Sequence, residues 1–220
     1  MSIKDNLHRI KDSLPPHVTL VAVSKTKPVA DLMEAYDAGQ RIFGENKIQE
    51  MSDKAAQMPT DIEWHMIGHV QSNKVKNMAS FVSLVHGVDS LKLLEEINKQ
   101  ALKNSRIINC LLQMHIAEEE TKFGLDAAEL VELISSEQIK HLPNIKICGL
   151  MGMATFTDDQ TQLKKEFLSL RSHFDSLSLQ PITPNFEPTI LSMGMSGDYL
   201  LAIDCGSTMV RIGSSIFGTR

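Results

Sequence analysis

The sequence lacks the features that mark membrane proteins, exported proteins and nucleic-acid-binding proteins. No stretch stays apolar for the roughly 20 residues that a membrane-spanning helix needs, and the opening residues, MSIKDNLHRI, contain no apolar signal-peptide core. The net charge is −5, and the lysines and arginines are scattered rather than gathered into a basic patch. We therefore expect a soluble, cytoplasmic protein whose partners are small molecules or other proteins, with no membrane and no nucleic acid among them.

Cysteines are few, and metal-binding and nucleotide-binding motifs are missing. The three cysteines, Cys110, Cys148 and Cys205, lie far apart in apolar runs, which is typical of buried thiols rather than of disulfides or a metal cluster. His65 and His69 fall on a predicted strand and turn, with no cysteine or carboxylate at ligand spacing. The Walker A, G-x-G-x-x-G and H-E-x-x-H patterns are also absent. The sequence therefore predicts no metal site, and it gives no support to a nucleotide-binding or redox function.

What the sequence does contain is a regular alternation of strand and helix patterns. Short runs rich in β-branched and apolar residues begin at Val18, Arg41, Glu63, Phe81, Asn109, Ile145, Glu187 and Thr208. Most are continuously apolar, as strands covered on both faces are. Segments of helical spacing lie between them, one after Pro28 and one behind the capping box of Asp126 and Glu129.

This alternation predicts the fold. About eight strand and helix units in 220 residues predict a single-domain (β/α)8 TIM barrel spanning residues 1–220. Ile3, Leu7 and Ile10 stand at helical spacing ahead of the first strand and predict an extra N-terminal helix. A doubly wound open sheet is the structural alternative.

Lys25 is the first candidate for chemistry, because active sites of such barrels lie at the C-terminal ends of the strands. It closes the first apolar run, and an amine at the rim of an apolar barrel loses its proton readily enough to form a Schiff base with an aldehyde. Lys27 competes for this role, but its place beside Pro28 favours solvation. The simpler interpretation of Lys25 is also a solvated lysine.

The last two strands end in serine and glycine residues that resemble a phosphate site. The candidates are Ser192, Ser196, Gly213 and Ser214. Glycine lets the backbone approach an anion closely, and hydroxyl and backbone N–H groups donate to it. The loops after strands seven and eight are the usual phosphate site of these barrels, although two ordinary turns would have the same composition.

Two further side chains are candidate neighbours of a bound ring. Arg211 lies inside the last apolar run, where a cation is costly unless it is paired or faces a ligand. It is therefore a donor to a ring nitrogen or part of a structural ion pair. Asn46 closes the second run, and it is either a neighbour of the ring or a helix-capping residue. His65 is interpreted as a hydrogen-bonded residue at the rim.

These motifs, in this order, resemble the pyridoxal phosphate homeostasis protein family, whose barrel is that of the alanine racemase N-terminal domain. The resemblance covers nearly the whole chain and is carried by AVSKTKP at 22–28, DAGQRIFGENKIQE at 37–50, WHMIGHVQSNK at 64–74, KFGL at 122–125, GLMGMAT at 149–155, LSMGMSGD at 191–198 and GSTMVRIGSSIFGTR at 206–220. It implies pyridoxal 5′-phosphate as the cofactor, with a Schiff base on Lys25 and Asn46 near the ring. It places Arg211 at the pyridine nitrogen, and it implies a phosphate near Ser192, Ser196, Gly213 and Ser214.

The resemblance implies a carrier that holds the cofactor and supplies it to apo forms of pyridoxal-phosphate-dependent enzymes. An arginine at the pyridine nitrogen disfavours ring protonation and weakens the ring as an electron sink. Related racemases add a C-terminal domain that supplies a catalytic tyrosine, whereas the two tyrosines here, Tyr36 and Tyr199, fall on helix patterns. We expect a monomer that binds the cofactor rather than catalyses with it. A small amino-acid racemase and a Schiff-base aldolase are the alternatives.

Overall fold

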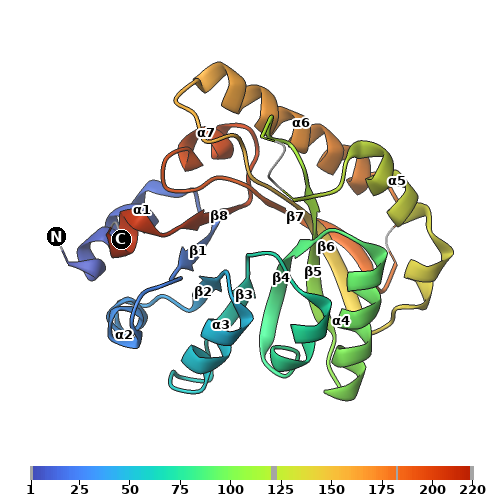
Figure 1. Ribbon diagram of the computed structural model, residues 1–220. Helices are drawn as coiled ribbons and strands as arrows, with labels where there is room; N and C mark the ends of the chain where they lie inside the picture. Colours follow the sequence, from blue (N-terminus) through green and yellow to red (C-terminus); the bar gives the residue numbers. More distant parts are fainter. Residues whose placement is uncertain (1, 120–122, 182, 219–220) are drawn as a thin grey trace.

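The structure is a closed barrel of eight parallel strands with helices around it, which confirms the predicted (β/α)8 fold (Figure 1). The computed structural model describes residues 2–119, 123–181 and 183–218. The strands are β1 (Thr19–Val23), β2 (Ile42–Glu45), β3 (Glu63–Met66), β4 (Val82–Val88), β5 (Ile108–Met114), β6 (Ile145–Gly152), β7 (Phe186–Ser192) and β8 (Met209–Ile212). Pairing of β1 with β8 closes the barrel, so the open sheet is excluded.

Helices follow the strands on the outside of the barrel. They are α1 (Ile3–Ser13), α2 (Val29–Asp37), α3 (Ile48–Ala55), α4 (Leu91–Lys103), α5 (Ala127–Ser135), α6 (Gln160–Ser178), α7 (Tyr199–Asp204) and α8 (Ser214–Phe217), with 3-10 turns η1 (Ser72–Asn77) and η2 (Glu137–His141). The predicted N-terminal helix is present as α1. The predicted capping box begins α5, because Glu129 N donates to the Asp126 carboxylate at 2.8 Å and Asp126 N donates to that of Glu129 at 2.9 Å.

Apolar side chains fill two layers, as the alternation of side chains along barrel strands requires. A smaller cluster, which includes Val21, Leu84, Leu111 and Met209, fills the interior of the barrel. A larger cluster lies between the strands and the helices, and Phe167 of α6 is fully buried in it. Within the described residues, none of the helices has both the length and the apolar character that a membrane crossing requires.

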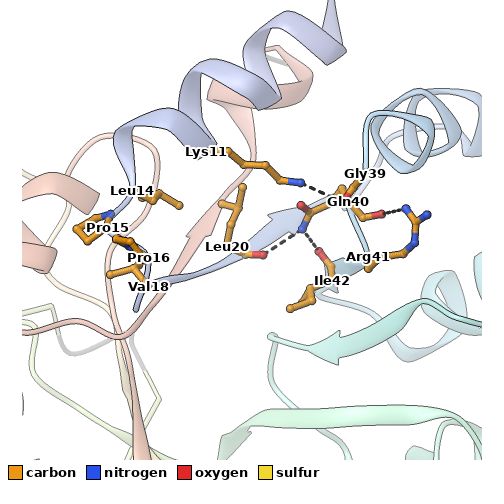
Figure 2. A pocket seen from close by; sticks show the side chains of 10 residues that line it. All are labelled: Lys11, Leu14, Pro15, Pro16, Val18, Leu20, Gly39, Gln40, Arg41 and Ile42. Atoms are coloured by element: carbon orange, nitrogen blue, oxygen red, sulfur yellow. Dashed lines mark hydrogen bonds between the residues drawn. The ribbon is translucent and has the colours of Figure 1, made fainter.

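The two ends of the barrel differ. Residues at the starts of β1 and β2 line a hollow of about 340 Å³ (Figure 2). Lys11 Nζ donates to the Gly39 carbonyl at 3.0 Å, and Gln40 Nε2 donates to the carbonyls of Leu20 and Ile42 at 3.0 and 2.7 Å (Figure 2). These donors are used within the protein, and the predicted site residues lie at the opposite rim, where the strands end.

The C-terminal helix α8 packs against α1, so segments far apart in the sequence lie side by side (Figure 1). Asn6 Nδ2 donates to the Ile216 carbonyl at 3.1 Å and fixes this contact. The helix that follows β8 is therefore held against the helix that precedes β1. Lys122 of the KFGL segment, and Thr219 and Arg220 after α8, lie outside the described residues.

Candidate functional site

Lys25 and Asn46 leave adjacent strands at the same rim of the barrel. Val23 at the end of β1 is paired with Gly44 of β2, so the same register continued by two residues places Lys25 beside Asn46. Lys25 is half-buried, as is Asn46. The partial burial predicted for Lys25 at the barrel mouth is therefore present.

Gly213 lies on the other side of Lys25, at the end of β8. Ala22 is paired with Ile212, so Gly213 lies beside Val23. A β-carbon at Gly213 would be only 3.0 Å from the Val23 carbonyl oxygen, closer than ordinary contact. Glycine at this position therefore allows the β8 loop to run directly alongside the strand that carries Lys25.

The loop after β7 meets the loop after β8 at a small set of backbone donors. The Ser196 hydroxyl oxygen accepts from Gly213 N at 3.3 Å and from Ser215 N at 3.4 Å. Ser214 begins α8 and is exposed beside them. Both hydrogen bonds are long for N–H donors, so two backbone N–H groups converge here on a weakly held oxygen. A phosphate oxygen is a stronger acceptor for the same groups.

Arg211 is buried inside the barrel and bonds to neutral oxygens. Nη1 donates to the Ser192 carbonyl at 2.9 Å and to the Ser192 hydroxyl at 2.7 Å, and Nη2 donates to the Gly152 carbonyl at 2.9 Å. Within the described ranges no carboxylate forms an ion pair with this guanidinium, so the predicted structural ion pair is not found. Burial lowers the pKa of Arg211 to about 10, which still leaves it charged at neutral pH.

Ser192 therefore lies elsewhere than the other phosphate candidates. It is fully buried, and its hydroxyl is held by Arg211 on one side and His86 Nδ1, at 3.2 Å, on the other. Ser196, Gly213 and Ser214 come together at the rim, whereas Ser192 belongs to the interior. The continuous apolar run that contains Ser192 is the sequence signal for this burial.

Two buried histidines continue the series of hydrogen bonds that begins at Arg211 and Ser192 and crosses the interior of the barrel. His86 of β4 bonds to Ser192 of β7, and His86 Nε2 lies 3.1 Å from His65 Nδ1 on β3. Burial lowers the pKa of His65 to about 3 and that of His86 well below 6.5, so both rings are neutral at physiological pH. His65 has the predicted hydrogen bond, but it lies in the interior and not at the rim. His86 was not predicted, although it is a polar residue within an apolar run.

Lys27 and His69 both have partners at the rim. Lys27 is half-buried and donates to the Phe217 carbonyl at 3.0 Å, so it is only partly open to solvent. His69 lies 3.6 Å from Asp89 and stacks on Phe123, with 4.6 Å between the ring centroids. Within the part of the chain that the structure describes, no group of three or more potential metal ligands occurs.

Comparisons with known proteins identify the family of this chain. The family model described as alanine racemase, N-terminal domain, matches residues 1–220. The pyridoxal phosphate homeostasis protein of Pasteurella multocida is 39% identical over 233 residues, which cover 100% of this chain and 98% of that protein. The chain belongs to the pyridoxal phosphate homeostasis protein family.

Solved structures place this homeostasis family among the related barrels. PipY of Synechococcus elongatus PCC7942, solved with pyridoxal phosphate bound, has a TM-score of 0.88 and 37% identity, covering 99% of this chain and 100% of that chain. Alanine racemase from E. faecalis has a TM-score of 0.75 and 16% identity, covering 99% of this chain but 58% of that chain. The racemase thus shares the barrel with the homeostasis family and has further chain beyond it.

Proposed function

We propose that this chain is a single-domain barrel that binds pyridoxal 5′-phosphate through a Schiff base on Lys25, and that it stores and supplies the cofactor. The observation that carries the proposal is the grouping of Lys25, Asn46 and Gly213 at the ends of three adjacent strands. An amine, a ring neighbour and a phosphate loop are the contacts that this cofactor requires. The cofactor, when bound, supplies a reactive aldehyde and a conjugated ring.

The residues present fit each functional group of the cofactor. Lys25 is half-buried at the rim, where its amine is suited to an aldehyde. The backbone N–H groups of Gly213 and Ser215 converge with the Ser196 hydroxyl, which suits a phosphate. Arg211 is buried two residues deeper along β8, where it is a cation bonded to neutral oxygens and suits an electron-rich ring nitrogen.

Storage is favoured over catalysis by the positions of the tyrosines. Tyr36 OH donates to Asp61 at 2.9 Å on the outside of the barrel, and this hydrogen bond raises the pKa of Tyr36. Tyr199 OH lies 3.1 Å from the Ser13 hydroxyl at the end of α1. Both tyrosines are therefore committed elsewhere. A charged arginine facing the ring nitrogen also disfavours its protonation, and so disfavours carbanion chemistry.

The relatives support the same proposal. PipY was solved with pyridoxal phosphate bound, and the bacterial relatives are named for pyridoxal phosphate homeostasis. We accordingly assign this chain a role in the cytoplasmic balance of the cofactor, acting as a monomer. Its transient partners are apo forms of pyridoxal-phosphate-dependent enzymes.

The visible spectrum tests the cofactor and its lysine. Purified protein is mixed with pyridoxal 5′-phosphate, freed of excess, and scanned before and after borohydride reduction. We expect a yellow, reducible chromophore in the wild type and in Lys27→Ala, and none in Lys25→Ala. A chromophore that persists in Lys25→Ala but not in Lys27→Ala would transfer the role to Lys27. No chromophore in any protein would discard the cofactor and favour the aldolase.

A transfer assay tests the supply function. Loaded protein is mixed with an apo-enzyme, and recovery of that enzyme's activity is compared with the rate at which the loaded protein releases cofactor to a chemical trap. We expect recovery faster than release. Equal rates would contradict direct supply, and turnover of an amino acid by the loaded protein itself would establish the racemase instead.

A further inference from the structure

A buried ionic cluster lies directly behind the turn that carries Lys25. Its centre is Lys54 of α3, whose ammonium donates to the Glu45 carboxylate at 2.7 Å, to the Glu50 carboxylate at 2.7 Å and to the Ser24 carbonyl at 2.8 Å. The side chain of Lys54 is 7% exposed and that of Glu45 is fully buried. We call Glu45, Glu50 and Lys54 the triad.

The triad holds both chain neighbours of Lys25. On one side, the Ser24 hydroxyl donates to Glu45 Oε1 at 2.6 Å. On the other side, Thr26 N donates to Glu50 Oε1 at 2.5 Å. Lys25 thus lies between two residues that are fixed by the same three side chains. Changes in the triad will act first on the position of the Lys25 backbone.

The turn itself is strained and needs such support. Thr26 has φ of +65°, in the left-handed region that β-branched residues rarely occupy. Lys27 N donates to the Ser24 carbonyl at 3.1 Å, which closes the turn with Lys25 and Thr26 at its centre. Strained residues persist only where their surroundings over-determine them, and they gather at functional sites. The hydrogen bond from Thr26 N to Glu50 supplies this support.

The triad contributes less to the stability of the fold than apolar side chains of the same volume would. Glu45 Oε2 is buried and has no hydrogen-bond partner among the residues that the structure describes. Burial raises the pKa of Glu45, although the hydrogen bonds from Lys54 and Ser24 oppose this. A buried ion cluster with an unsatisfied oxygen stabilises a fold less than apolar packing of the same volume. Its hydrogen bonds with Ser24 and Thr26 point instead to a role in holding the turn around Lys25.

We propose that Glu45, Glu50 and Lys54 are positioning residues, which hold the Ser24–Lys27 turn so that the Lys25 amine faces its aldehyde. This inference rests on the proposed function. In the reaction itself the neutral amine adds to the aldehyde carbon, a C=N bond forms and water leaves. The triad exchanges no atoms with the reactants, and its effect is on orientation.

The test separates binding from bond formation. Pyridoxine 5′-phosphate, which has an alcohol in place of the aldehyde, reports binding without the covalent step, and the rate of chromophore formation with pyridoxal 5′-phosphate reports the step itself. In Glu50→Ala we expect that rate to fall at least about tenfold, because misplacement of a reacting group has effects of this size or larger. Affinity for pyridoxine 5′-phosphate should stay within about twofold of the wild type. The loops proposed to hold its phosphate follow β7 and β8, away from Glu50.

Matched variants distinguish a loss of Lys25 positioning from a general loss of folded structure. Glu50→Gln keeps an oxygen for Thr26 N and should restore most of the rate. Gln49→Ala changes the neighbouring exposed residue of α3, which contacts Asp53, and should behave as the wild type. An unchanged rate in Glu50→Ala, or an equal loss of rate and of pyridoxine 5′-phosphate affinity, would overturn the positioning role alone. A wild-type protein that forms no chromophore would overturn the proposed function as well.

Discussion

Nη1 of Arg211 donates to the Ser192 hydroxyl at 2.7 Å and thereby ties β8 to β7 inside the barrel. The guanidinium also bonds to the carbonyls of Ser192 and Gly152. Because Arg211→Met removes three hydrogen bonds from buried oxygens, we expect the free energy of unfolding to fall by about 3 kcal/mol. Urea denaturation measures the change.

Arg171→Met is the matched control for that variant. Arg171 pairs with Asp175 on the surface of α6, where its side chain is 41% exposed. Exposed pairs of this kind contribute about 0–1 kcal/mol, so we expect little change. An Arg211→Met protein more stable than the wild type would mean that relief of the buried charge outweighs the lost hydrogen bonds.

The two interior histidines predict a loss of stability in acid. Their pKa values are lowered in the folded protein, to about 3 for His65, so below pH 6.5 the unfolded chain binds protons that the folded chain does not. Stability therefore falls as the pH drops from 6.5 towards 3. Between about pH 7 and pH 5 we expect a loss of about 2 kcal/mol for each histidine that stays neutral.

Urea titrations at a series of pH values measure this slope. Replacing one member of the pair, in His65→Gln, should make the slope shallower. His8→Gln, at an exposed position on α1, should leave it unchanged. A slope that is the same in all three proteins would show that the interior pair is not its source.

The position of the Ser196 hydroxyl leads us to expect that its loss weakens binding of pyridoxal 5′-phosphate but not of pyridoxal. Under the proposed function, Ser196→Ala removes a hydroxyl that would donate to the phosphate beside Gly213 N and Ser215 N. We expect the dissociation constant for pyridoxal 5′-phosphate to rise about tenfold, equivalent to about 1.4 kcal/mol. Affinity for pyridoxal, which has no phosphate, should not change. Ser176→Ala on α6, whose hydroxyl donates to the Ser172 carbonyl, is the control, and equal losses for both ligands would contradict a phosphate contact.

Gly149 predicts a severe packing defect when it is substituted. Its φ is +145°, and a β-carbon there would lie 1.9 Å from the Ile190 carbonyl oxygen on the neighbouring strand. In Gly149→Ala either β6 or β7 must move, so we expect a loss of at least about 3 kcal/mol. Gly197→Ala, with nothing within 4 Å of its added carbon, should be nearly neutral in thermal unfolding. Similar melting temperatures would refute the clash.

The strands were predictable because most of them lie in continuous apolar runs, and α1 and α2 because their sequences have helical spacing. α3 escaped prediction for a physical reason. It is short, and one of its buried residues is Lys54, so its buried face does not appear apolar in the sequence. Two of the partners that make this burial tolerable, Ser24 and Glu45, come from the turn after β1 and from β2, and the local pattern of α3 does not contain them.

The candidate site was predictable in part for the same reason. Lys25, Asn46 and Gly213 were found because strand ends mark the rim of a barrel. The bond between Ser192 and His86 was not, because it joins β7 to β4 across the interior. Contacts of this kind depend on barrel closure, whereas a polar residue within an apolar run indicates only that some partner exists.

The contact between Lys27 and Phe217 joins residues 190 positions apart, and it lies beside the loops proposed to hold the phosphate. A ribosome that has made β1 must therefore make almost all of the barrel before β8 arrives to pair with it. Such long-range closure is slow and leaves strand edges open meanwhile. A nascent chain consequently has Lys25 before β8 is in place, and under the proposed function cofactor capture would follow completion of the barrel.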